Sequence, residues 1–367
     1  MSQNPPRISS IDALRGADML LLAGGGALLR ALSPLWGGAE LSRQLTHAGW
    51  AEPLTCWDMV MPLFIFIVGA SMPFAFAKYR QQGRGRTIWR VLRRCALLFL
   101  LGMLVQGQLA SAEPARMSLF CNTLQAIAEG YFIAALCHLF GGWRTQLLTC
   151  LACLLVYWAA LRFIPYEGHE AGLFQPGDNL AIWLDHYLQG HWQDGTPYSW
   201  ILTALSFAAL TLMGSLGGTV LMHRSQGWHL LLILLLAAGG CMLAGQLLSL
   251  DTPIIKHIYT SSMVLWSGGL CFALLAIFHA AFDYSAVAAR AAMPLRVMGC
   301  NAMLAYLLTQ TPGLHGLSLW QGLCHPLLGG VAALAGPASG VVMEGLSLAL
   351  LWLLLLVLYR HKLFLRV

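Results

Sequence analysis

Long apolar runs recur along almost the whole of this sequence. A run of about 20 apolar residues crosses the hydrocarbon core of a bilayer as a helix, which satisfies its own backbone hydrogen bonds. Only 10% of the 367 residues are charged and 58% are hydrophobic. The sequence therefore predicts an all-α, polytopic integral membrane protein with about ten transmembrane helices in a single domain over residues 1–367. The predicted spans cover residues 17–32, 57–77, 95–110, 119–140, 145–161, 199–222, 229–248, 258–281, 297–311 and 338–358.

The basic residues indicate how these spans are oriented. An even number of spans places both termini on one side, and 16 of the 21 Lys and Arg residues fall on that side, against 5 on the other. Basic residues of short loops accumulate on the cytoplasmic side. The pattern therefore predicts cytoplasmic termini and places the loop that holds His47 on the outer face. The first polar stretch leads into a span that the chain needs, so no cleaved signal peptide is expected.

The net charge of +6 follows from the same distribution. Basic loops are attracted to the anionic headgroups of the bilayer, so the charge requires no nucleic-acid partner, and none is expected. Five arginines between residues 84 and 94 form a dense cluster. This cluster is either a topology signal alone or an additional site for a cytosolic anion such as a phosphorylated cofactor.

Residues 47–73 run from a polar segment with His47 and Asp58 directly into a predicted span. Ionisable residues at a membrane boundary are expensive to keep, so function is their default interpretation. An imidazole near neutral pH takes up protons or acts as a nucleophile, and a carboxylate can orient and stabilise it. We therefore predict that His47 and Asp58 are catalytic, on condition that the two side chains meet. The histidines show no metal-ligand spacing, and no metal is expected.

Polar residues also mark the first and fourth spans. Asp12 and Arg15 are three residues apart, which allows an ion pair at the cytoplasmic end of the first span or a plain interfacial helix start. Gln125 and Glu129 share one face of the fourth span. They are either satisfied buried groups or, as is usual for a carboxylate within a span, groups that face a cavity.

Two later spans carry a polar residue near one end. Lys256 opens the eighth span from the outer side, where it either snorkels to the interface or meets Asp58 or an anionic ligand. Asn301 lies near the inner end of the ninth span, and its amide either bridges helices or lines a channel. The three long outer loops, rich in Gly, Pro and Trp, either bind a ligand or cap helix ends. They cover residues 33–56, 162–198 and 312–337.

Six motifs in a fixed order carry a resemblance to a known family. They are R-I-S-S-I-D-A-L-R-G, T-H-A-G-W, L-T-C-W-D-M-V-M-P-L-F-I-F-I-V-G-A-S, L-Q-A-I-A, K-H-I-Y-T-S-S and G-C-N-A-M-L-A-Y. From Arg7 to about Tyr306, the chain resembles the heparan-alpha-glucosaminide N-acetyltransferase family of transmembrane acyltransferases. It lacks the amino-terminal lumenal domain and first span of the lysosomal enzyme, so we expect the catalytic core alone, in a bacterial inner membrane.

The resemblance implies transfer of an acetyl group from cytosolic acetyl-CoA to an amino sugar or related glycan on the extracytoplasmic side. His47 matches the catalytic histidine of the family, and Asp58 matches the carboxylate that follows it. Two departures stand out: the chain reads L-A-G-G-G-A where the family often has Asn before Gly, and Ala126 where it has Arg. The second departure removes a possible contact with CoA.

The first, second, fourth, eighth and ninth spans carry nearly all of the intramembrane polar groups and are expected to line a polar passage to His47. The charged nucleotide of CoA would stay at the basic face, while its thin pantetheine arm penetrates. The residues expected to contact the cofactor along this passage are Asp12, Arg15, Gln125 and Asn301. Those expected to bind the acceptor near its outer mouth are Trp50, Lys256 and Tyr259.

The sequence leaves the mechanism and the acceptor open. His47 either removes the proton of the acceptor or accepts the acetyl group first, and Asn301, Tyr259 or a backbone amide stabilises the thioester oxygen. An O-acyltransferase of cell-envelope polysaccharide is one alternative. A small-molecule transporter is the other, although spans 1 to 5 and 6 to 10 share no motif of the kind that transporter repeats show. A homodimer also stays open.

Overall fold

The computed structural model describes residues 8–36, 38–79, 82–108, 117–223, 227–313 and 316–365. Five of the basic residues that indicated the orientation lie outside the described residues: Arg7, Arg80, Arg116, Arg224 and Arg366. Within the described ranges the chain is helical, and its β-pairing consists of three isolated bridges in loops. The predicted all-α class is therefore confirmed for this part of the chain.

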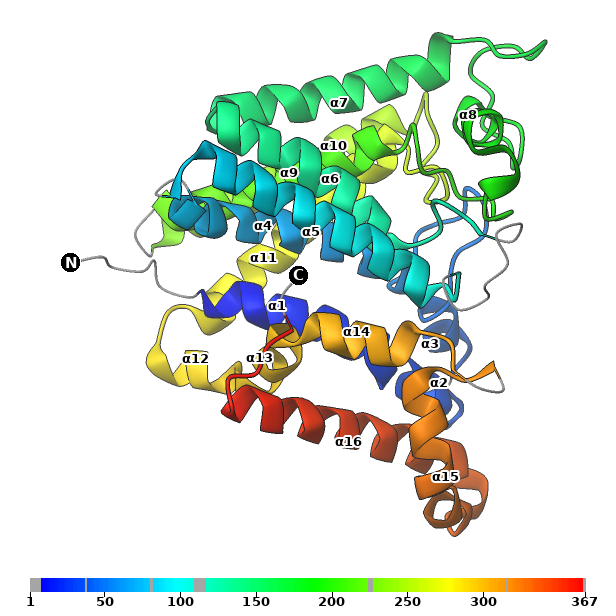
Figure 1. Cartoon of the computed structure of the whole chain (residues 1–367), viewed down its shortest axis with the longest axis vertical. Coiled ribbons are helices and arrows are strands. Elements are labelled where there is room, and N and C mark those ends of the chain that lie inside the picture. Colours follow the sequence, from blue (N-terminus) through cyan, green and yellow to red (C-terminus); the bar gives the residue numbers. More distant parts are fainter. Residues whose placement is uncertain are drawn as a thin grey trace.

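The helices follow one another in the order shown in Figure 1. In the first half they are α1 (Ser9–Leu20), η1 (Leu21–Gly25), α2 (Gly26–Leu32), η2 (Ser33–Trp36), α3 (Ala39–Gln44), η3 (Trp57–Met59), α4 (Val60–Tyr79), α5 (Arg84–Val105), α6 (Thr123–Phe140), α7 (Trp143–Phe163), α8 (Leu180–Gln189) and η6 (Gly190–Trp192). In the second half they are α9 (Ala204–His223), α10 (Trp228–Leu248), α11 (Ser261–Phe282), α12 (Ala286–Ala291), α13 (Met293–Cys300), α14 (Ala302–Gln310), α15 (Leu319–Ala333), η8 (Gly336–Ala338) and α16 (Ser339–Arg360).

Seven helices in the described ranges are long and apolar enough to cross a membrane. This finding supports an integral membrane protein, but it does not confirm the ten predicted spans as a set. The seven spans are Trp57–Tyr79, Thr123–Phe140, Trp143–Phe163, Ala204–Met222, Trp228–Leu248, Ser261–Phe282 and Gly336–Arg360.

The other three predicted spans fall on helices that are charged or interrupted. Helix α5 begins with the five arginines of the basic cluster. The first predicted span is interrupted at Gly24, whose φ of 144° is accessible to glycine but strained for other residues. The ninth is divided at Asn301, where α13 ends and α14 begins. Interrupted helices are tolerated at membrane depth where protein surrounds them.

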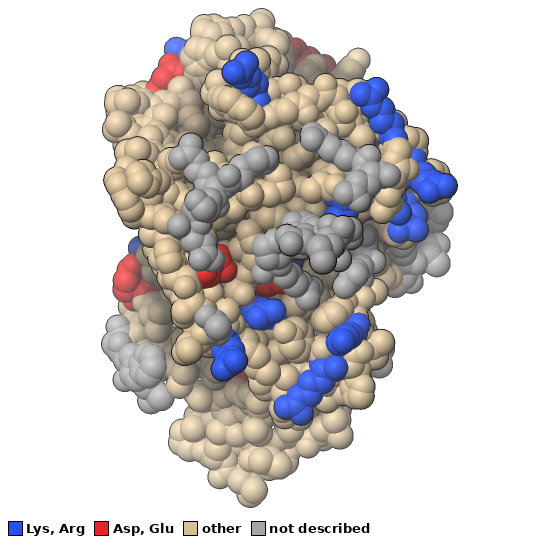
Figure 2. Space-filling model, turned by 90° about the vertical axis from the view of Figure 1, so that its left-hand side faces the viewer, with Lys and Arg blue, Asp and Glu red and all other residues tan. Residues whose placement is uncertain are grey.

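The long helices lie side by side and run between two ends of the molecule (Figure 1). We call the end at which α1 begins and α16 ends the terminal end, and the opposite end, which holds α3 and α8, the loop end. Figure 2 shows the terminal end, with Lys and Arg side chains spread across it. This arrangement agrees with the charge pattern of the sequence, and the side of the membrane on which each end lies stays a prediction.

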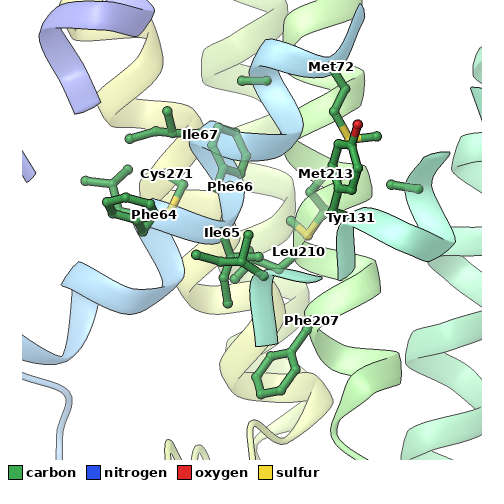
Figure 3. Close-up of a cluster of buried hydrophobic side chains, with 14 of the residues drawn as sticks. Phe64, Ile65, Phe66, Ile67, Met72, Tyr131, Phe207, Leu210, Met213 and Cys271 are labelled. Atoms are coloured by element: carbon green, nitrogen blue, oxygen red, sulfur yellow. The ribbon is translucent and has the colours of Figure 1, made fainter. Parts of the chain in front are cut away.

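Glycines of α9 bring its backbone against the backbone of α4 at the centre of the molecule. A Cβ atom on Gly214 would lie 2.0 Å from the carbonyl oxygen of Phe66, and one on Gly218 would lie 2.1 Å from that of Ala70. Such contacts let membrane helices approach closely without a polar group between them. Around this contact, side chains of α4, α6, α9 and α11 form an apolar cluster (Figure 3). The start of α4, which follows Asp58, is thereby held against α9.

Candidate functional site

Asp58 organises the loop that precedes α4. It is the second residue of η3, and its side chain is fully buried. Its Oδ2 atom accepts hydrogen bonds from the backbone N–H groups of Ala48 (3.1 Å) and Thr55 (3.0 Å), and from the Thr55 hydroxyl (3.0 Å). Because these donors come from both ends of residues 48–55, they fold this loop back onto the start of α4. His47 is thereby placed beside the carboxylate.

His47, Asp58 and Lys256 meet at the loop end. The Nδ1 atom of His47 lies 3.0 Å from Oδ1 of Asp58, and the Nζ atom of Lys256 lies 2.7 Å from the same oxygen and 2.6 Å from Nδ1. The Lys256 side chain is 6% exposed and the His47 side chain 55% exposed. The structure thus brings His47 and Asp58 together, and it adds Lys256 from a segment 198 residues away from Asp58.

The surroundings of Lys256 disfavour its charged form in part. Burial lowers the pKa of Lys256, while the hydrogen bond to Asp58 opposes this shift. The pKa of the adjacent His257 is also lowered, by burial and then by the charge of Lys256. The ring of Tyr198 lies 5.8 Å from the Lys256 ammonium and compensates for some of the lost hydration.

His47 and Lys256 line an open cavity of about 360 Å³. Its walls come from η1, η3, α4, the end of α5, the start of α6, α9, α14 and the loops around residues 194–200 and 256–259. Asp194 and His257 also line it, while Phe64, Ile127 and Phe207 give it an apolar inner wall. A cavity with mostly apolar walls and a few convergent polar groups is typical of small-molecule sites.

Tyr259 lines the same cavity, and Trp50 lies next to it. The Tyr259 side chain is buried, its hydroxyl has no hydrogen-bond partner among the described residues, and its backbone has a φ of 42°. Positive φ in a bulky residue is a strained conformation that is often found at functional sites. Trp50 donates its indole N–H to the carbonyl oxygen of Phe174 (2.8 Å) and stacks on His257, so it supports the wall from behind.

Asp12 and Arg15 pair with each other away from this cavity. Their side chains are 3.2 Å apart, which is the predicted i, i+3 contact, and Arg15 also donates to the hydroxyl of Ser71 on α4 (2.5 Å). These contacts join α1 to α4 near the terminal end. Neither residue is among the described residues that line the cavity.

Gln125 and Asn301 are also not among the described residues that line the cavity. Gln125 forms the capping box of α6 with Asn122, and its Oε1 atom accepts from the backbone N–H groups of Cys121 (2.8 Å) and Asn122 (3.1 Å). Asn301 binds the backbone of Leu363 (3.1 Å) and Leu365 (3.2 Å), and so attaches the segment after α16 to the break in the ninth predicted span. Their predicted contact with a cofactor stays a prediction.

A second cavity of about 360 Å³ lies at the terminal end, between the end of α4, the start of α5 and the end of α6. Arg84 and Thr87 line it together with Phe76 and the buried His138. Between the two cavities, the α4 side chains of Ile65, Phe66, Ile67, Ala70 and Met72 belong to the apolar cluster of Figure 3. The predicted polar passage would have to cross this cluster.

Sequence reasoning did not single out two polar residues at the cavity, Asp194 and Tyr306. Asp194 lies in the second long outer loop, but no spacing distinguishes it from the other polar residues there. The Tyr306 hydroxyl donates to Oδ1 of Asn122 (3.1 Å), a contact between α14 and the start of α6. No described group of three or more His, Cys, Asp or Glu side chains is close enough to hold a metal ion. That no metal takes part stays a prediction.

Comparison with known proteins relates the chain to an acetyltransferase. It is a distant relative of heparan-alpha-glucosaminide N-acetyltransferase of Homo sapiens, to which it is 22% identical over 372 aligned residues. The alignment covers 83% of this chain and 53% of the human protein, so the chain spans about half the length of that relative. No protein-family model matches the chain. The resemblance found in the six motifs is therefore confirmed as a distant relationship.

Proposed function

We propose that this chain is a transmembrane acyltransferase that moves an acetyl group from acetyl-CoA to the amine of an amino sugar or related glycan at the loop end. One observation carries the proposal: a buried carboxylate holds His47 at the wall of a cavity, in a chain distantly related to an N-acetyltransferase. Because Nδ1 of His47 faces Asp58, the other ring nitrogen, Nε2, is the one that is available to the reacting groups.

In the proposed reaction, Nε2 of His47 acts either as a base or as a nucleophile. The acceptor nitrogen attacks the thioester carbonyl carbon, the carbon–sulfur bond breaks, and the amine proton passes to Nε2 of His47 before it reaches the leaving thiolate. In the alternative, Nε2 attacks the carbonyl first and forms an acetylimidazole that the amine then cleaves. In both cases the carboxylate of Asp58 stabilises the positive charge that develops beside it.

Tyr259 is the donor that we assign to the thioester oxygen. A hydroxyl aimed at the developing negative charge stabilises the transition state. Tyr259 lines the cavity with His47, and its hydroxyl lacks a described partner, whereas Asn301 is engaged with the segment after α16. Burial raises the pKa of Tyr259, so the hydroxyl keeps its proton at neutral pH.

The donor is proposed to approach from the terminal end. A cavity of about 360 Å³ suits the acetylated end of the pantetheine arm but is small for the whole of CoA. The phosphates of the nucleotide favour arginine, and Arg84 lines the second cavity at the basic end. The arm would then cross the apolar cluster of Figure 3 through movement of its side chains.

The experiment uses purified protein in sealed vesicles. Labelled acetyl-CoA is supplied on one side and glucosamine on the other, and the labelled product is measured for the wild type, His47→Ala and His169→Ala. His169 is the matched control, because it is also half-exposed and also pairs with an aspartate, Asp178, at 2.9 Å. We expect His47→Ala to lose activity by at least about 100-fold and His169→Ala to keep it.

The same experiment distinguishes the competing functions. Comparable activity of His47→Ala and the wild type would overturn the assignment of His47. Label transferred to a hydroxyl of glucosamine, with none on its amine, would identify an O-acyltransferase. Passage of glucosamine without covalent label would identify a transporter.

A further inference from the structure

The contacts of His47 with Asp58 and Lys256 restrict where the hydrogens of this site can lie. Three atoms form a triangle: Nδ1 of His47, Oδ1 of Asp58 and Nζ of Lys256, with sides of 3.0, 2.7 and 2.6 Å. In the ring plane Nδ1 has either one hydrogen or one lone pair, so only one of its two short contacts can be a hydrogen bond at a time. An ammonium group only donates, and a carboxylate only accepts. The protonation state of Lys256 therefore decides what Nδ1 can do.

When Lys256 is an ammonium, the 2.6 Å contact requires Nδ1 of His47 to accept. A neutral imidazole with an accepting Nδ1 carries its proton on Nε2. That nitrogen, which is the one left for the substrates, then donates and cannot take up a proton. When Lys256 is a neutral amine, Nδ1 can carry the proton and donate it to Asp58 or Lys256. Nε2 is then unprotonated and basic.

We propose that Lys256 is a positioning residue that determines which ring nitrogen of His47 carries the proton, and so switches His47 between an acidic and a basic form. The inference rests on the proposed function and deepens it. The acceptor amine gives its proton to Nε2 while Nδ1 gives its proton to Lys256. The leaving thiolate then takes the proton from Nε2, and Lys256 returns its own to Nδ1. Every proton is accounted for and the starting state is restored.

The position of Lys256 supports this role. Its side chain is only 6% exposed. Burial lowers the pKa of Lys256, which makes its neutral amine form easier to reach. The titratable groups that face the triangle are His257 on the same loop and Tyr198 on the loop before α9. Asp194 and Tyr259 lie on the cavity wall, and Arg30 lies 5.2 Å from the ring of Trp57, behind His47.

Two substitutions separate this role from a structural one. The turnover number is measured against pH for the wild type, Lys256→Arg and Lys256→Met with the same acceptor. Because the acceptor titrates identically in all three assays, the ratio of the turnover number of a variant to that of the wild type reports only the pH dependence of the enzyme. Arginine stays charged at every pH and keeps Nδ1 accepting, so we expect Lys256→Arg to lose activity by about 100-fold or more at high pH and by less as the pH falls, where Lys256 of the wild type is charged too.

Methionine removes the donor, so Nδ1–H can pair with Asp58 at every pH. The activity of Lys256→Met relative to the wild type should therefore rise as the pH falls. If both variants lower the turnover number by a factor that does not change with pH, Lys256 is structural and the inference is wrong.

A spectroscopic test needs neither activity nor a variant of Lys256. Nitrogen-15 NMR of histidine-labelled wild type, minus the spectrum of folded His47→Gln, isolates the two ring nitrogens of His47. We expect a proton on Nε2 at neutral pH and its replacement by a proton on Nδ1 at high pH. A proton on Nδ1 throughout would overturn the inference, whether or not the protein transfers acetyl groups.

Discussion

Asp58 and Lys256 form a buried ion pair, and the stability of the site depends on both. Asp58 is fully buried and Lys256 nearly so, with 2.7 Å between Oδ1 and Nζ. Removing one partner of a buried pair leaves an uncompensated charge, which typically costs about 3–5 kcal/mol. Replacing both with uncharged side chains of similar shape often restores the stability.

The first prediction uses this coupling. Asp58→Asn should lower the free energy of unfolding by about 3–5 kcal/mol and the turnover number steeply, while CoA affinity changes little. The double variant Asp58→Asn/Lys256→Met should regain most of the stability but none of the activity. Denaturation in mixed micelles and acetyl-transfer assays measure the two effects. Additive losses of stability in the double variant would show that the two side chains are not coupled.

A second prediction concerns Asp185 on α8. Its carboxylate accepts from the backbone N–H groups of Trp200 (2.6 Å) and Ile201 (3.0 Å), and burial raises its pKa to about 6. Because the folded state holds this proton more tightly than the unfolded state, stability falls as the pH rises from about 4 to about 6, by up to about 3 kcal/mol. Amide exchange at Trp200, corrected for its intrinsic rate, should show more protection at pH 5 than at pH 7.5. Asp185→Asn should remove this difference, and an unchanged difference would assign it to another group.

At the scale of helices, charge and glycine explain where the structure departs from the expected spans. The predicted spans on α4, α6, α7, α9, α10, α11 and α16 are found close to the expected residues. The run 95–110 is apolar, but the helix that contains most of it, α5, begins at Arg84 and includes the arginines before that run. In the runs 17–32 and 297–311, hydropathy does not register the φ of Gly24 or the break at Asn301. Such features depend on what surrounds the helix.

The third prediction tests the contact between α4 and α9. Gly214→Leu places side-chain atoms where the backbone of Phe66 lies, so it should separate the helices, lower the unfolding temperature by several degrees and weaken donor binding. Gly240→Leu is the control, because no described atom lies within 4 Å of a Cβ at Gly240 on α10. Equal effects of both changes would mean that leucine in a membrane helix, and not this contact, is responsible.

For the whole molecule, chemical labelling tests on which side of the membrane the loop end lies. All ten cysteines are among the described residues, and Cys56, beside the site, is the exposed one. If the loop end faces outward, a membrane-impermeant maleimide should label Cys56 in intact cells, and Cys56→Ser should lose that label. Labelling that appears only after the cells are permeabilised would reverse the predicted orientation.

The sequence by itself determined the class of protein and the two residues at the centre of the site. Apolar runs report membrane helices directly, because each helix satisfies its own backbone whatever its neighbours are. His47 and Asp58 are only 11 residues apart, within one loop and the helix that follows it. Their contact is thus close to a local property of the chain.

Only the tertiary structure decided the rest of the site. Lys256 reaches Asp58 across 198 residues, and helix packing, which no local spacing reports, brings the two together. The same packing encloses the cavity and leaves the Tyr259 hydroxyl without a described partner on its wall. It also directs Gln125 to the cap of α6 and Asn301 to the segment after α16. A polar residue in a span signals that a partner exists, but the arrangement of the helices determines whether that partner is a substrate or the protein's own backbone.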